Sequence, residues 1–530
     1  MNQIILLIGI VIVICVLLHH WIEKLPVPSL LIFLGLGMIF GENGILKISF
    51  DNYVASEIIC SACLIFIIYY GGFGVNLKAA KTVIKPAIFL STLGVALTAV
   101  IVGIFAHFIF DIPMLQGLLI GSLIASTDAA SVFSVLRSQK LSLKYHTDSL
   151  LELESGSNDP ISYMFTVVFT TLLLGDNISI SLMLLSQIIV GALCGIIIAK
   201  ITIHLLNRLK TQLDQATTIL VVAAVLIAYA LPTLFNGNGY LSVYICGILM
   251  GNSEIPEKRN QAHFFDTLTG IAQMLIFFLL GLLVTPAKLP EVFIPSLIIM
   301  LFLTFIARPL AVSAILMPFK AKLNQILLVS WSGLRGVASI VFAIYVVTHD
   351  IVLPFNIFNL VFCIVLMSIA FQGTGLPFVA KKFKMIDEDA NVQKTFNDYQ
   401  ENSPMNFLKV HIEENDQWEN KYIKDLTFPK ELLIAIIIRN KHDIIVPSGD
   451  TLILKGDLVV LAGHEFDDRK NLMLQEITID ENHKWNNKAL NEINIDKGTL
   501  IVMLERNHQT IVPSGDTVIL EYDTLVIAQF

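Results

Sequence analysis

Long apolar runs restrict the fold of this chain more than any other feature of its sequence. A helix that crosses the hydrocarbon core of a bilayer needs roughly 20 apolar residues, and the chain contains about thirteen such runs. They cover residues 3–21, 28–45, 55–74, 84–110, 116–137, 152–174, 177–207, 215–233, 238–252, 263–284, 289–317, 325–348 and 353–380. The first run lacks the basic start and the small-residue cleavage site of a signal peptide. These runs predict a polytopic α-helical membrane protein, in agreement with a mean hydropathy of +0.73.

Basic residues between the runs predict the orientation of the chain. We counted the Lys and Arg residues in the loops up to residue 385. With the C-terminus in the cytoplasm, Lys47 and Lys288 fall in loops outside the cell, and the others fall in cytoplasmic loops. Cytoplasmic loops of membrane proteins are enriched in Lys and Arg. We therefore predict a multi-pass protein of the cell membrane with its N-terminus outside and its C-terminus in the cytoplasm.

The C-terminal part has a different composition and contains a repeat. Charge density rises from Lys381 onward, and the net charge of −8 is concentrated in this tail. Its sequence Val-Pro-Ser-Gly-Asp-Thr occurs at 446–451 and again at 512–517, within two longer matching segments that each predict a small α/β unit. The predicted domains are a transmembrane domain at 1–385, a linker at 386–410 and two repeat units at 411–470 and 476–530. The absence of a basic stripe with interleaved aromatic residues argues against a nucleic-acid partner.

Charged residues inside the apolar runs indicate where function lies. Asp128, Asp159 and Arg335 each lie about 12 to 18 Å from an end of their run, near the middle of the membrane. Charges at this depth usually face a water-filled cavity or one another. For Asp159 we favour a role in binding an ion or a proton over a structural ion pair, whereas for Glu154 and Arg335 we favour a structural pair.

The runs that contain Asp128 and Arg335 also contain residues that weaken a helix. Ser126 and Thr127 precede Asp128, and two glycines bracket Arg335. A helix that unwinds at this depth exposes carbonyls that can bind a cation. The two runs are seven spans apart, so they cross the membrane in opposite directions, as expected for an inverted repeat. A chance pair of breaks is the alternative, because Gly and Ser are frequent in membrane helices.

Five stretches of the first domain resemble the NhaP-type monovalent cation/proton antiporters, and the closest branch is that of the potassium/proton or cell-volume-regulation antiporters. They read STDAASVFSVL, LLELESGSNDPISYMFTV, GNGYLSVYICGILMGN, FFDTLTGIAQMLIFFLLGLLVTP and SWSGLRGVASI. The resemblance implies thirteen helices, a homodimer, crossed unwound helices five and twelve, and alternating access. Carried over by position, the ion- and proton-binding residues are Asp159, Asn158, Asp128, Thr127 and Ser155. It also implies an ion pair between Glu154 and Arg335, whereas Tyr70 stands where relatives commonly have an acidic residue.

The predicted site can exchange one ion for another. A monovalent cation needs several oxygen ligands and one negative charge, and Asp159 with its neighbours supplies both. A carboxylate that holds either a proton or a cation, but not both, makes the two compete. Because position 158 is Asn rather than a second Asp, one negative charge takes part, which predicts 1:1 electroneutral exchange. The choice between potassium and sodium stays open, since both use the same oxygen ligands.

The repeats in the tail resemble the TrkA-C, or RCK C-terminal, domain of potassium-conductance regulators. That resemblance implies that the two units pair, and some members bind cyclic di-AMP between the paired units. The residues expected to contact its phosphates are Arg439, Asn440, Arg506 and Asn507. The alternative is that each Arg pairs with an acidic residue on a solvated strand. We expect no cofactor, because the chain lacks a glycine-rich nucleotide fingerprint.

Three other functions fit the sequence less well than antiport. A ligand-gated cation channel with a sensor tail is the main alternative, but the chain lacks a TVGYG-like filter sequence. A membrane sensor that does not transport would have no need of Asp159. An enzyme is disfavoured, because no set of nucleophile and base and no metal-binding motif can be assembled, and the six cysteines all lie in apolar runs.

Overall fold

Helices form the first part of the chain up to Lys382, and strands begin at Met405. The chain divides into two units, Met1–Gln393 and Lys394–Phe530, which are described separately. The computed structural model describes residues 9, 13, 30–41, 47, 50, 52–77, 79–138, 141, 143–175, 179–209, 214–351, 353–387, 405–414, 416, 418–426, 432–439, 443–464, 473–481, 483–493, 499–506, 509–511 and 513–529.

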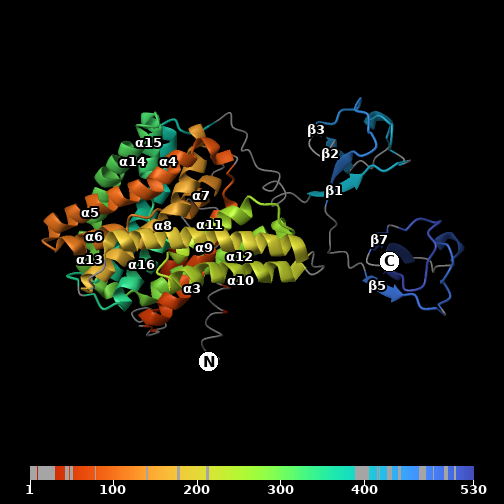
Figure 1. Cartoon of the computed structure of the whole chain (residues 1–530). Helices are drawn as coiled ribbons and strands as arrows, with labels where there is room; N and C mark the ends of the chain where they lie inside the picture. Colours follow the sequence, from red (N-terminus) through yellow and green to blue (C-terminus); the bar gives the residue numbers. More distant parts are fainter. Residues whose placement is uncertain are drawn as a thin grey trace. The chain divides into compact units, whose positions relative to one another are not determined.

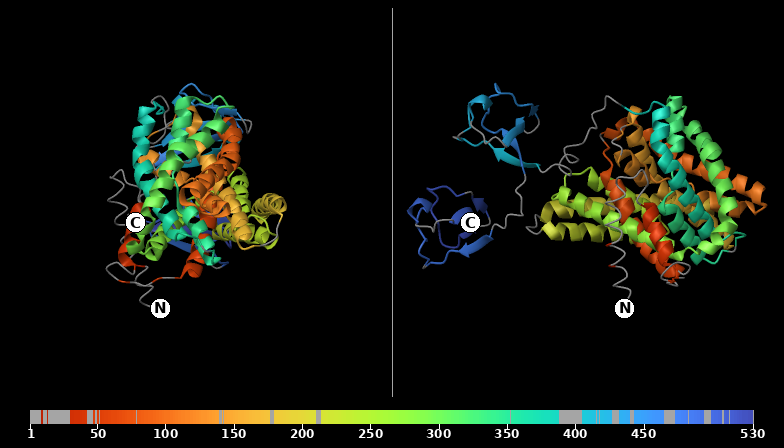
Figure 2. Two further views of the ribbon diagram at one scale, coloured as in Figure 1. Left: turned by 90° about the vertical axis from the view of Figure 1, so that its left-hand side faces the viewer. Right: turned by 180° about the vertical axis from the view of Figure 1, so that it is seen from behind.

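Seven helical stretches among the described residues are long and apolar enough to cross a membrane. They are α3 (Tyr53–Gly74), α4–η2–α5 (Ile84–Phe89, Leu90–Gly94, Val95–Phe110), α9 (Ile180–Leu209), α10 (Asp214–Leu234), α12 (Lys258–Leu283), η4–α13–η5–α14 (Pro286–Lys288, Leu289–Phe302, Leu303–Ala307, Arg308–Leu316) and α17–η6–α18 (Ile357–Ser368, Ile369–Gly373, Thr374–Lys382). The helices α9 and α10 lie side by side along one side of the unit (Figure 2).

The other helices are shorter or more polar. They are α2 (Leu30–Phe40), η1 (Ala79–Thr82), α6 (Met114–Leu123), α7 (Ala129–Ser138), η3 (Lys144–His146), α8 (Thr147–Leu173), α11 (Gly239–Gly251), α15 (Leu323–Trp331) and α16 (Val337–Thr348). Each predicted run from the second onward corresponds to one helix or to a broken pair, and the run at 3–21 lies almost entirely outside the described residues. The breaks and the charges explain why fewer than thirteen stretches have the length and composition of a simple span.

Close helix contacts hold the broken helix α6 against α5. A Cβ atom on Gly121 would lie 2.1 Å from the carbonyl oxygen of Ala99, so only glycine fits there. Small residues let membrane helices approach in this way. On its other side α6 packs against α8, which also contacts α16 (Figure 1). The helix with the motif Glu-Ser-Gly-Ser-Asn-Asp-Pro therefore lies between the two broken helices.

The second unit contains two sheets with the same topology. The first sheet has the order β1-β4-β2-β3 and the second β5-β8-β6-β7, and all neighbouring strands are antiparallel. The strands are β1 (Met405–His411), β2 (Leu432–Arg439), β3 (Asp443–Ile445), β4 (Leu458–His464), β5 (Met473–Thr478), β6 (Thr499–Arg506), β7 (Gln509–Ile511) and β8 (Thr524–Gln529), and each sheet has one 3-10 turn, η7 (Ile423–Asp425) or η8 (Leu490–Glu492). Each sheet has its own apolar core, with Trp418 packed against one and Trp485 against the other. The sequence repeat is therefore a repeat of structure.

Candidate functional site

Two helices break at mid-length, and their breaks meet. The first break separates α6 from α7 at residues 124–128, and the second separates α15 from α16 at residues 332–336. The backbone N–H of Asp128 donates a 2.8 Å hydrogen bond to the carbonyl of Leu334, which joins the two breaks. Such irregular backbone at membrane depth is tolerated where it is buried in protein or lines a cavity. The predicted crossing of the fifth and twelfth spans is confirmed.

Arg335 fastens the second break to the first. Its guanidinium Nη1 donates to the carbonyls of Ala125 and Ser126, at 2.8 and 2.5 Å, and its backbone N–H donates to the Ser368 hydroxyl at 3.0 Å. Ala125 and Ser126 belong to the unwound segment, so their carbonyls have lost regular helical partners. The fully buried Arg335 thus stabilises the crossing itself.

Helix α8 supplies side chains that bind the crossing from the other side. The Ser155 hydroxyl donates to the carbonyl of Thr127 at 2.6 Å, and the Asn158 amide donates to the Thr127 hydroxyl at 2.6 Å. Both donors are buried. The structure therefore brings Ser155 and Asn158 to the break that contains Thr127, as the sequence predicted for their positions.

Asp159 lies beside this network with part of its carboxylate unused. The side chain is half-buried, and its Oδ1 is buried without a hydrogen-bond partner among the described residues. Ser126 and Asp128 both lie near enough to the carboxylate to interact with it electrostatically. The buried Oδ1 of Asn158 also lacks a partner among those residues. An unpaired carboxylate oxygen beside an unpaired amide oxygen suits a bound cation, and the carboxylate also suits a proton, because buried polar groups are costly when unpaired.

Asp128 has a second role at the start of α7. Its carboxylate accepts hydrogen bonds from the backbone N–H and the hydroxyl of Ser131, so it caps the N-terminus of that helix. The backbone at Gly336 passes so close that a Cβ there would lie 2.4 Å from the Cβ of Asp128. The crossing therefore requires glycine at this position.

We expect Gly336→Ala to destabilise the protein by about 1–3 kcal/mol, as overpacking typically does, and to reduce transport. Thermal unfolding of the purified protein in detergent measures the first effect. Gly71→Ala is the matched control, because nothing lies within 4 Å of a Cβ at Gly71. Equal melting temperatures for the two variants would contradict the steric argument.

The structure corrects the predicted ion pair. Glu154 pairs through Oε1 with Nη2 of Arg308, the first residue of α14, and not with Arg335. Both partners are buried. The sequence held a signal for Arg308, since it is the only charged residue between Glu291 and Lys320. The pair therefore ties α8 to α14, and Arg335 interacts with it only electrostatically.

Five charged side chains form a cluster around the crossing. They are Asp128, Glu154, Asp159, Arg308 and Arg335. With every group ionised, three carboxylates face two guanidinium groups and leave one negative charge. One bound monovalent cation, or one proton, neutralises the cluster, which is the favoured state in a medium of low dielectric constant.

Arg439 and Arg506 in the tail each form an ion pair within their own repeat unit. Arg439 donates through Nε and Nη2 to both carboxylate oxygens of Asp457, and Arg506 does the same to Asp523, all at 2.7–2.8 Å. Both aspartates are buried. The pairing of each arginine with an acidic residue is thus confirmed, although that residue is buried rather than on a solvated strand, and contact with a ligand phosphate stays a prediction. Asn440 and Asn507 lie outside the described residues.

Asp457 should make the stability of the first sheet depend on pH. Burial raises the pKa of its carboxyl, but hydrogen bonds from Arg439 and from the N–H of Leu454 outweigh this and hold the pKa below its ordinary value of 3.8. A lowered pKa stabilises the fold above the unfolded pKa, and the stabilisation is lost as pH falls through the folded pKa. We expect Asp457→Asn to cost roughly 1–3 kcal/mol at pH 7 and progressively less below about pH 4.

Hydrogen exchange of peptides covering 432–464 in the full chain tests this pH dependence. Asp450→Asn is the control, because Asp450 is 83% exposed and pairs with Lys424 at the surface. We expect less than about 0.5 kcal/mol for the control. A loss of protection in Asp457→Asn that stays as large at about pH 2.5 as at pH 7 would contradict the prediction.

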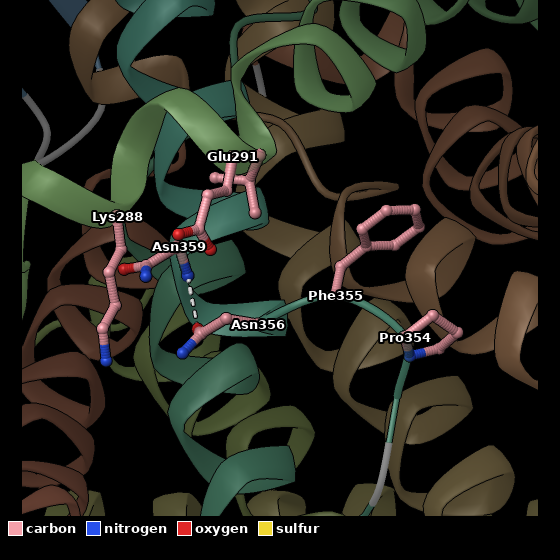
Figure 3. A pocket seen from close by; sticks show the side chains of 7 residues that line it. Lys288, Glu291, Pro354, Phe355, Asn356 and Asn359 are labelled. Carbon is pink, nitrogen blue, oxygen red and sulfur yellow. Dashed lines mark hydrogen bonds between the residues drawn. The ribbon is translucent and has the colours of Figure 1, made fainter.

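A small hollow lies elsewhere in the first unit, where α13 and α17 begin (Figure 3). Lys288, the last residue of η4, and Glu291 of α13 line it on one side, while Asn356, which precedes α17, and Asn359 of α17 line it on the other. None of the five cluster residues borders it, so it is distinct from the crossing.

Broken helices that cross beside a half-buried carboxylate define a class of secondary transporter, in which the substrate binds at the unwound crossing. Comparisons with known proteins agree. The family model described as "Sodium/hydrogen exchanger, transmembrane" matches residues 9–382, and that of the TrkA-C domain matches 408–465 and 474–528. The chain belongs to the sodium/hydrogen exchanger family and carries two TrkA-C domains.

Individual relatives extend the comparison. The chain is 33% identical over 458 residues to K(+)/H(+) antiporter NhaP2 of Shewanella sp. (strain ANA-3). This match covers 85% of this chain and 79% of that protein. It is 32% identical over 467 residues to K(+)/H(+) antiporter NhaP of Alkalimonas amylolytica. This match covers 87% of this chain and 81% of that protein. The fold is similar to the sodium proton antiporter MjNhaP1 of Methanocaldococcus jannaschii, with a TM-score of 0.64, 24% identity, and coverage of 72% of this chain and 98% of that one.

Proposed function

We propose that the chain exchanges K⁺ or Na⁺ for H⁺ by alternating access, with Asp159 as the shared binding group. The observation that supports this most is the half-buried Asp159 carboxylate with an unpaired oxygen beside the crossing. K⁺ is the first cation to test, since the relatives from Shewanella and Alkalimonas carry the name K(+)/H(+) antiporter. Asn158, Ser155, Thr127 and Asp128 orient the site and supply oxygens.

The cluster of five charges supports a stoichiometry of one cation per proton. Either ion brings the cluster to neutrality, so each crossing of the membrane carries no net charge. Exchange is therefore electroneutral. We place the N-terminus outside and the C-terminus in the cytoplasm of the cell membrane, and we propose a homodimer.

Proton flux in proteoliposomes tests the function. The purified chain should drive proton movement when K⁺, Na⁺ or Li⁺ is added, at several pH values, without creating a membrane potential. A ligand-gated channel would instead pass the cation alone and create a potential. A catalytic activity without transport would also refute the proposal.

The tail is proposed to regulate transport. A segment near the end of the first unit lies beside the start of α8: the N–H of Lys144 donates to the carbonyl of Met385 at 2.8 Å, and Leu143 forms an isolated antiparallel bridge with Ile386. Met385 directly precedes the predicted linker at 386–410, and Ile386 begins it. Helix α8 begins four residues after Leu143. A displacement of the linker can therefore be transmitted to the helix that carries Asp159. Cyclic di-AMP is the first ligand to test, by calorimetry on residues 400–530.

Lys144→Pro should disconnect the tail from α8. Proline removes the N–H that bonds to Met385, and it fits the first position of η3, where that N–H has no helical partner. We expect the pH of half-maximal transport to move by about 0.5–1 unit, since coupling energies are typically about 1 kcal/mol. Lys144→Gln keeps the N–H and should leave the profile in place. If both variants match the wild type, the coupling proposed here is wrong.

A further inference from the structure

Four tyrosines gather on one side of Asp159. Tyr163 lies one turn beyond it on α8, and its ring packs against Tyr240 at 4.9 Å and Tyr345 at 5.7 Å. Tyr229 packs against Tyr240 at 5.0 Å. These four residues, the tyrosine cluster, come from α8, α10, α11 and α16.

The packing of the tyrosine cluster closes this side of the site. Tyr163 meets Tyr240 edge to face, and the fully buried Tyr240 also contacts Phe342. Such edge-to-face pairs stabilise the packing beyond what the burial of their apolar area contributes. Ser61 and Tyr229 lie close to Tyr240, so polar groups continue through the apolar packing.

Glu57 lies at the far side of the tyrosine cluster. It is the fifth residue of α3, and its side chain is half-buried. Helix α3 packs against α8, α10 and α16, the helices that carry Tyr163, Tyr229 and Tyr345, and the Glu57 charge lies near enough to act on these three side chains. It makes no ion pair with a described residue. A half-buried carboxylate next to aromatic faces attracts cations through its charge and through cation–π contacts.

The opposite side of Asp159 is built differently. Tyr244, one turn from Tyr240 on α11, interacts with both Asp159 and Glu152, and its ring packs on Gly156. Asp159 thus lies between a side that leads to Glu152 and a side that leads through the tyrosine cluster to Glu57. The cytoplasmic start of α8 puts Glu152 on the inner side and Glu57 on the outer side, in the proposed orientation.

We propose that Glu57 binds the cation in transit on the outer side of Asp159, and that the tyrosine cluster is the barrier that opens to let it pass. This inference rests on the proposed cation/proton exchange. It assigns to Glu57 a role on one side only, whereas Asp159 serves both.

Exchange measured separately in right-side-out and everted membrane vesicles tests the assignment, with K⁺ and Na⁺ as probes. Glu57→Gln should raise the half-saturating external cation concentration roughly five- to tenfold and leave the internal one within about twofold. Glu291→Gln is the control: Glu291 lines the hollow of Figure 3 on the same proposed side, without contact to the tyrosine cluster. It should match the wild type.

Restoring a negative charge at position 57 distinguishes a role of Glu57 in cation transit from a structural role. Glu57→Cys should show the same one-sided shift, and a membrane-impermeant thiol reagent bearing a sulfonate, added outside, should reverse it. A reagent bearing a quaternary ammonium group should not reverse the shift. Wild-type protein treated with the same reagents controls for their reaction with the native cysteines. Equal shifts on both sides, no shift, or no rescue would overturn the proposal. Absence of exchange in the wild type would instead refute the proposed function.

Discussion

Asp159→Asn is expected to abolish cation-dependent proton flux, to the background of protein-free liposomes. The substitution keeps the shape and size of the side chain and removes its ability to carry a charge or exchange a proton. The cluster then has two carboxylates and two guanidinium groups, so it is neutral without a bound ion and has no charge to offer a cation. Flux driven by K⁺, Na⁺ or Li⁺ gradients measures the loss.

The control for this experiment lies on the same helix. Asp148→Asn makes the same chemical change in the first turn of α8, where Asp148 accepts a hydrogen bond from the N–H of Ser149 and touches none of the cluster residues. It should transport like the wild type. Asp159→Asn should also elute as a folded protein, and retained flux in that variant would show that another group carries the proton.

Breaking the pair between Glu154 and Arg308 should have the largest effect on stability. Removing one partner of a buried ion pair leaves the other charge uncompensated, which typically costs about 3–5 kcal/mol. We expect Glu154→Gln and Arg308→Gln each to lower the melting temperature sharply and to reduce expression. The double variant should recover much of the loss, because neither charge is then left alone.

A double-mutant cycle distinguishes this pair from the one that the sequence suggested. The coupling energy between Glu154 and Arg308 should exceed about 3 kcal/mol, because each single variant is expected to cost about 3–5 kcal/mol and the double variant less than either. Coupling between Glu154 and Arg335 should be much smaller, since Arg335 bonds to the carbonyls of the first break instead. A larger coupling with Arg335 would favour the original assignment.

Sequence alone was sufficient for the class of fold and for the place where the two broken helices cross. Apolar runs of membrane length follow from the bilayer itself, which every spanning helix must match. The breaks around Asp128 and Arg335 were predictable because residues that weaken a helix coincide there with charges. The repeat in the tail was visible as a repeated string of letters, and it became two sheets of equal topology.

The partners of buried charges were decided only by the tertiary structure. Glu154, Arg308 and Arg335 each read as a costly charge in an apolar run, and sequence spacing does not state which two meet. The Arg308 side chain reaches Glu154 from α14, whereas the carbonyls of Ala125 and Ser126 in the unwound segment accept hydrogen bonds from Arg335. Glu57 and the tyrosine cluster come together from five helices in the same way. The membrane fixes where helices begin and end along the chain, but contacts between helices far apart in sequence depend on how they pack.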